Sequence, residues 1–259
     1  MDWGTRRRVI IIAIFFGILV LIGMYLFYSI FVKKPETCND NLRNQDERGI
    51  DCGGVCTRMC INDVSPVITL WQRPVKISDG VYSAIAYIEN KNQTSGIQKL
   101  SYEMRMYDEK NILLTEPVNG HTFIAPNSRT AIIENNLVTG NRSPKTVFFT
   151  LKNPVLWDRV LPYPDQSNIV SSNIEVRDIE KYPKISARIK NNHATHDYRN
   201  IPIIIIVYDS VGNIITLSNT VIDILPHASE KNIYFSWQIP FGEKPARIEI
   251  IPRINPFTI

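Results

Sequence analysis

The feature that most constrains this chain is an uncharged run of 24 residues from Val9 to Val32. As a helix rising about 1.5 Å per residue it is roughly 36 Å long, enough to cross a bilayer with some tilt. A secretory signal has an apolar core of about 7–15 residues before a small-residue cleavage site. This run is longer and ends in Phe-Val-Lys-Lys-Pro. It predicts an uncleaved signal anchor at residues 9–32, with a cleaved signal peptide as the alternative.

Orientation depends on the charges on either side of this run. Three arginines precede it at residues 6–8, and Lys33 and Lys34 follow it. The positive-inside rule favours the side with more positive charge as cytoplasmic. Cysteines just past the helix suit an oxidising compartment. We therefore expect a single-pass protein of the cell membrane, with a cytoplasmic stub at residues 1–8 and an extracytoplasmic C-terminal part.

The net charge of +4 belongs to the anchor. Of 29 Lys/Arg and 25 Asp/Glu, residues 1–34 hold five and one, which leaves 24 of each for residues 35–259. A neutral ectodomain lacks the basic field that draws proteins to phosphate backbones, so the charge predicts no nucleic-acid partner.

The chain beyond Asn62 shows short alternating segments rich in β-branched and aromatic residues, separated by Asn, Asp, Gly and Pro. This pattern predicts an all-β fold. The segment Ile201–Tyr208 has no polar residue on either face. It is expected to be a central strand covered on both sides, or one edge of a buried contact between domains.

The same order of features occurs twice, which predicts two tandem domains. The matched features lie 100 to 102 residues apart. In the two copies they are Tyr82 and Tyr182, Asn90 and Asn191, Tyr107-Asp108 and Tyr208-Asp209, Asn111-Ile112 and Asn213-Ile214, and Pro126 and Pro226. Asn90 and Asn191 are expected to end strands by bonding backbone groups of the next loop, and the Tyr-Asp pairs to begin hairpin turns. Each copy has about seven strand candidates, as in an immunoglobulin-like β-sandwich.

These halves resemble the FxLYD-type immunoglobulin-like domains of bacterial and archaeal envelope proteins. The resemblance rests on a strand-ending Asn, a Tyr-Asp hairpin and a later proline, and it implies fold and location but no activity. The expected sandwiches span residues 63–152 and 169–259. A proline-rich connector at 153–168 joins them with limited hinge motion, and Trp157 is expected to cover the joint.

Residues 33–62 form a cysteine-rich module with Cys38, Cys52, Cys56 and Cys60. In an oxidising space the four sulfurs can pair in three ways; Cys38–Cys52 with Cys56–Cys60 is one, and the spacing does not choose. The spacing departs from that of zinc sites and redox C-x-x-C motifs. Hard oxygen ligands leave Ca²⁺ open as a possible cofactor. These candidate ligands are Asp40, Asn44, Asp46, Glu47 and Asp51.

The same stretch resembles a short D-C-G-G-x-C element of bacterial surface proteins. The fit includes Asp51, Cys52 and Cys56, whereas Asn41 replaces a glycine and Cys60 comes one residue late. The resemblance implies surface exposure.

No G-x-S-x-G elbow, phosphate-cradling glycine loop or H-E-x-x-H motif occurs in the sequence. His193 and His196 form an H-x-x-H beside Asp197, which is more typical of a polar turn than of a metal site. The sequence thus predicts a non-enzymatic envelope protein that presents two domains as a spacer or protein-binding surface, without an evident small-molecule substrate. The alternative is an accessory subunit of a membrane enzyme, secretion or assembly complex, whose helix packs through Ala13 and Gly17.

Overall fold

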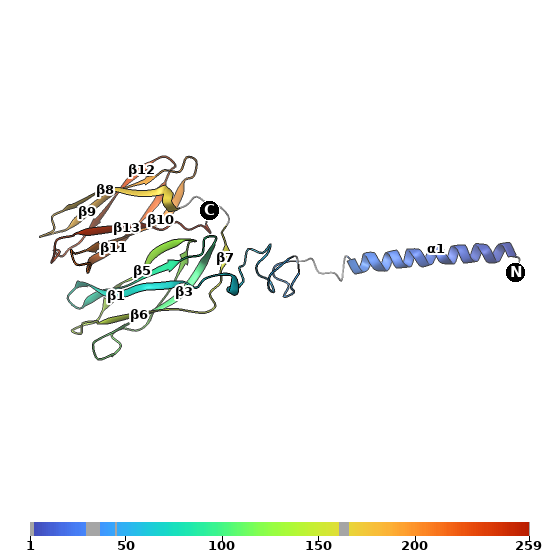
Figure 1. The fold of residues 1–259 in the computed structure, drawn as a ribbon, viewed down its shortest axis with the longest axis horizontal. Helices are drawn as coiled ribbons and strands as arrows, with labels where there is room; N and C mark the ends of the chain where they lie inside the picture. The colour runs from blue at the N-terminus through green and yellow to red at the C-terminus, as the bar shows by residue number, and fades with distance from the viewer. Residues whose placement is uncertain (1–2, 30–36, 45, 161–165, 259) are drawn as a thin grey trace. The chain divides into compact units, whose positions relative to one another are not determined.

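The computed structural model describes residues 3–29, 37–44, 46–160 and 166–258. The chain divides into two units, residues 1–56 and 57–259, and each is described by itself. The structure confirms an all-β fold with one N-terminal apolar helix and a small disulfide-containing module (Figure 1).

The helix α1 extends over Trp3–Phe27. Its stretch Arg6–Phe27 is long and apolar enough to cross a membrane, since 22 residues measure about 33 Å. Its apolar side chains are exposed all round rather than along one stripe, which is typical of a helix that meets lipid. The last three residues of the expected anchor, and Lys33 and Lys34, lie outside the described residues.

The first β-sandwich contains two sheets, in the orders β1-β2-β5 and β4-β3-β6, with the short strand β7 beside β3. Its buried core includes Ile88, Leu100, Met104 and Ile132. The strands are β1 (Ile68–Ser78), β2 (Val81–Asn90), β3 (Ser95–Tyr107), β4 (Val118–Ile124), β5 (Ser128–Val138), β6 (Thr146–Leu151) and β7 (Asp158–Arg159).

The second β-sandwich repeats this plan, with sheets in the orders β12-β9-β8 and β11-β10-β13. Its core includes Ile185, Ile189, Ile203 and Ile233. The strands are β8 (Ile169–Arg177), β9 (Lys184–Asn191), β10 (Tyr198–Tyr208), β11 (Ile214–Leu225), β12 (Glu230–Ser236) and β13 (Arg247–Pro252).

The two copies form the same hydrogen bonds at equivalent positions. Asn90 donates from Nδ2 to the carbonyls of Ser95 and Ala125, and its Oδ1 accepts the N–H of Asn92. Asn191 does the same with His196, Leu225 and the N–H of His193. Asp108 and Asp209 each accept two backbone N–H groups of their own turn. The roles predicted for these four residues are therefore confirmed.

The two sandwiches share a third apolar core, which the sequence did not reveal as such. It joins sheet β1-β2-β5 of the first sandwich to sheet β11-β10-β13 of the second. We call these two the inner sheets, and β4-β3-β6 and β12-β9-β8 the outer sheets. Figure 1 shows the resulting four layers. The members of the shared core are Val75, Ile85, Ala131, Ile204, Ile206, Tyr208, Leu217 and Ile251.

The strand β10 explains the wholly apolar segment at 201–208. Ile203 and Ile205 face the core of the second sandwich, and Ile204 and Ile206 face the shared core. Both alternatives offered for this segment are correct, because β10 lies at the centre of its sheet and that sheet is buried on both faces.

The C-terminal segment crosses from the second sandwich to the first. Arg253 Nη2 donates to Thr122 Oγ1 at 2.6 Å and to the carbonyl of Phe123 at 2.9 Å. Its guanidinium lies 4.7 Å from the centre of the Phe123 ring. Burial lowers the pKa of Arg253 to about 10. These contacts add a polar tie to the shared core.

The structure assigns parts of the expected connector and cysteine-rich module to the first sandwich. Trp157 is 3% exposed within the first core, not at the joint, and the β7 residues next to it pair with β3. Met59 donates its N–H to the carbonyl of Trp157, and Arg58 pairs with Asp158 at 2.9 Å. The middle of the connector, 161–165, lies outside the described residues.

Candidate functional site

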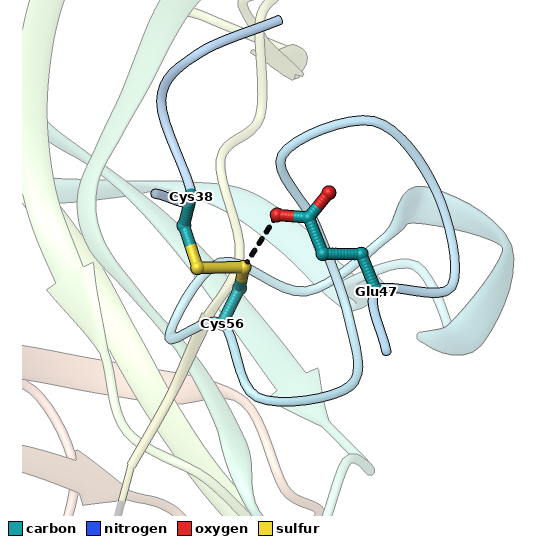
Figure 2. Close-up of side chains that lie close together, drawn as sticks. All are labelled: Cys38, Glu47 and Cys56. Atoms are coloured by element: carbon teal, nitrogen blue, oxygen red, sulfur yellow. Dashed lines mark hydrogen bonds between the residues drawn. A yellow bond between two sulfur atoms is a disulfide. The ribbon is translucent and has the colours of Figure 1, made fainter. Parts of the chain in front are cut away.

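The cysteine-rich module is held by a disulfide between Cys38 and Cys56 (Figure 2). Cys52 and Cys60 are also disulfide-bonded, and no cysteine in the described residues is free. The arrangement with a Cys38–Cys52 bond is therefore not the one found. A module with so small a core depends on such cross-links for its stability.

Glu47 lies against this disulfide and is 4% exposed. Its Oε2 accepts the N–H of Asp51 at 3.1 Å, and its Oε1 is 3.0 Å from Cys56 Sγ (Figure 2). A disulfide sulfur has no hydrogen to donate, so this is a packing contact of the carboxyl group. Cys38, Glu47 and Cys56 are close enough to surround an ion, but sulfurs joined in a disulfide are not the thiolates that bind metals.

Three of the five proposed calcium ligands accept hydrogen bonds from the loop itself. Asp51 accepts the N–H groups of Asp40 and Asn41. Asp40 accepts the N–H of Leu42 and an amide hydrogen of Asn44. Asp46 is exposed, and Glu47 is engaged as described. These carboxylates hold tight turns, which accounts for their spacing; calcium binding by them stays a prediction of the sequence.

Gly54 allows the chain to fold back in this module. It has a φ of +57°, and a Cβ there would lie 2.0 Å from the carbonyl oxygen of Asp46. The φ favours glycine, and the close approach of the Asp46 carbonyl leaves no room for a side chain.

The module provides a first testable prediction. Peptide mapping without reduction is expected to recover a Cys38–Cys56 link. Replacing Cys56 by Ser is expected to destabilise the module by about 3 kcal/mol. A Cys38–Cys52 link would contradict this account.

The histidines form a polar turn. His193 Nδ1 accepts the N–H groups of Thr195 and His196, which occupies one of its two ring nitrogens. His227 contacts Asp197 at 2.7 Å. Hydrogen bonds from the backbone and side chain of His227 lower the pKa of Asp197. Among the described residues, these groups do not converge as metal ligands.

Glu249 brings charge to the edge of the shared core. Its two carboxylate oxygens accept hydrogen bonds from the hydroxyls of Tyr87, on the first sandwich, and Tyr208, on the second. Burial raises the pKa of Tyr208 from 10.0 to about 12, with Glu249 adding to the effect. Burial and the same carboxylate also raise the pKa of Tyr87.

The raised pKa values of these tyrosines make the stability of the folded protein depend on pH in the alkaline range. A pKa that is higher in the folded than in the unfolded state contributes stability below pH 10, and this is lost as pH rises toward 12. We expect the urea midpoint of the full chain to fall over this range. Tyr208→Phe should flatten the fall, whereas Tyr182→Phe, at an exposed position, should not. An identical pH profile for both variants would refute this role.

Several grooves open on the unit 57–259. One crosses the outer sheet of the second sandwich and has a volume of about 520 Å³. Another, of about 720 Å³, lies between Lys76–Asp79 and the segment 236–242. Sequence reasoning missed both, although a comparison of outward-facing residues between the two repeats carries a signal for the first.

No family model and no curated protein matches the chain. Among solved structures, a putative beta-galactosidase from Bacteroides fragilis is 11% identical over 68% of this chain and 32% of its own, with a TM-score of 0.22. A beta-glucuronidase from glycoside hydrolase family 2 is 12% identical over 85% and 29%, with a TM-score of 0.22.

The N-terminal CBM22-1-CBM22-2 tandem domain from Paenibacillus barcinonensis Xyn10C is 10% identical over 73% of this chain and 82% of its own, with a TM-score of 0.16. The chain spans about a third of the two glycosidases. TM-scores this low carry no argument about this protein.

Proposed function

We propose that this is a non-enzymatic membrane protein that presents a rigid pair of immunoglobulin-like sandwiches outside the cell. The observation that carries the proposal is the shared core between the inner sheets. Two sandwiches joined by a flexible connector would move independently, whereas a buried apolar contact holds a fixed surface. The exposed apolar helix α1 supplies a means of attachment.

The orientation of the helix is tested by labelling lysines with an impermeant reagent on intact cells that express the full chain. Lysines of residues 57–259 are expected to react before lysis, while a cytoplasmic marker protein does not. Replacing Arg6, Arg7 and Arg8 by Gln leaves Lys33 and Lys34 as the flanking charges, so the labelled fraction should fall. Labelling only after lysis would overturn the proposal.

Crosslinking before detergent extraction distinguishes a protein that only displays its domains from an accessory subunit of a membrane complex. A display protein is expected to be recovered without a stoichiometric membrane partner. A partner recovered in equal amount, and lost when Gly17 is replaced by Leu, would instead favour the accessory subunit.

A further inference from the structure

The outer sheet of the second sandwich, β12-β9-β8, is the counterpart of the inner sheet β1-β2-β5 of the first. In the first copy, the side chains that point away from its own core pack into the shared core. They include Ile85, Tyr87, Ala131 and Ile133. Their counterparts 101 residues later are Ser186, Arg188, Asn232 and Tyr234. The outward face of this sheet is therefore polar in the second copy, whereas it is apolar in the first. No further sheet of the described residues covers it, and it is exposed to solvent.

The register of these strands produces the groove. Across the sheet, Ser186 of β9 lies between Tyr234 of β12 and Glu175 of β8. The small Ser186 side chain forms the floor, and the two larger side chains form the walls. Along β9, Lys184 and Arg188 stand on either side of Ser186. The two flanking strands are about 10 Å apart, since neighbouring strands are separated by about 4.8 Å.

The groove offers unused polar groups beside one aromatic face. Tyr234 is 71% exposed. Within the described part of the chain, its hydroxyl and the Lys184 ammonium have no partner. Arg177 pairs with Glu175 at 2.6 Å, and Arg188 with Glu230 at 3.3 Å. These two ion pairs leave Lys184 as the one cation of the described lining without a carboxylate partner, and its charge makes the groove electropositive.

This chemistry fits a carboxylated sugar better than a protein. A stable protein interface buries about 800 Å² per partner around an apolar centre. Among the outward-facing described residues of the lining, only Tyr234 offers an apolar surface. A pyranose ring has an apolar face for the tyrosine ring, hydroxyls for Asn232 and Ser186, and, in a uronic acid, a carboxylate for Lys184. The width of the groove accommodates a single ring.

We propose that this groove binds an acidic oligosaccharide of the uronic-acid type. Tyr234 stacks on a sugar ring, and Lys184 binds its carboxylate. Sugar binding by this groove does not depend on the orientation of the helix. An experiment that refutes one of the two proposals therefore leaves the other standing.

The test is calorimetric titration of the full chain in detergent micelles with a short oligogalacturonate. Its methyl ester has the same rings without the charge, and polyglutamate has the charge without the rings. Both are expected to bind at least about 10-fold more weakly than the oligogalacturonate. Tyr234→Ala and Lys184→Met are each expected to weaken oligogalacturonate binding about 10-fold.

Phe148→Ala is the matched control, because Phe148 is an exposed aromatic on the outer sheet of the first sandwich. It should bind like the wild type. Thermal unfolding checks that all three variants are folded, as expected for exposed positions. The proposal is overturned by an absence of oligogalacturonate binding, by equal binding of polyglutamate, or by unchanged binding in folded Tyr234→Ala.

Discussion

Replacing Ile206 by Asp is expected to destabilise the protein by about 4–5 kcal/mol, a large part of the stability of a typical domain. Ile206 is fully buried between the two inner sheets. An aspartate there has no cation to pair with in the apolar shared core, so its charge is either uncompensated or neutralised at a cost. Urea unfolding of the full chain, followed by circular dichroism and tryptophan fluorescence, measures the loss.

Val221→Asp is the control for this substitution. Val221 lies on β11 of the same inner sheet but is 53% exposed. A charge there remains hydrated, and the expected change is within about 0.5 kcal/mol. If Ile206→Asp unfolded at the wild-type midpoint, the inner sheets would not be buried against each other.

Replacing Asn191 by Ala is expected to cost about 3 kcal/mol. The buried amide donates to the carbonyls of His196, Leu225 and Pro226, and accepts the N–H of His193. Its removal leaves these groups without their partner in a region that water does not reach. The same urea titration of the full chain gives the change in free energy of unfolding.

Two further variants make this result specific. Asn191→Asp keeps the shape but replaces the donating amide with an oxygen that faces carbonyl oxygens, so it should be no more stable than Asn191→Ala. Asn192→Ala, at the exposed neighbouring position, should unfold like the wild type. A fully stable Asn191→Asp protein would show that the donated hydrogen bonds do not matter.

The repeat could be predicted from the sequence because the residues that mark it form hydrogen bonds with backbone groups. Asn90 and Asn191 close the same loop in both copies, and Asp108 and Asp209 hold the same turn. Local geometry of this kind depends on residue type and spacing alone. The fold class follows from the same signals, together with the alternation of buried residues along strands such as β9.

The stacking of the sandwiches could not be predicted in the same way, because it depends on which faces meet. The apolar segment 201–208, within β10, indicated burial on both sides without identifying the sheet that covers it. Trp157 illustrates the same limit: a tryptophan next to a proline-rich stretch fits a joint or a core equally well, and the structure places it in the first core.

The disulfide pairing of the cysteine-rich module could not be predicted from the sequence. Four cysteines allow three pairings, and spacing does not distinguish them. The structure selects Cys38–Cys56 through turns that depend on Gly54 and on the acceptors Asp40 and Asp51. The same residues fit calcium ligands by type, so that the sequence alone does not separate a turn-forming carboxylate from a metal ligand.

Differential scanning calorimetry of the full chain in detergent micelles tests most directly whether the two sandwiches form one body. The shared core predicts a single transition for residues 57–259, with equal calorimetric and van't Hoff enthalpies. Two separate transitions, one shifted by a substitution in each sandwich's own core, would show that the sandwiches fold independently and would contradict the four-layer arrangement.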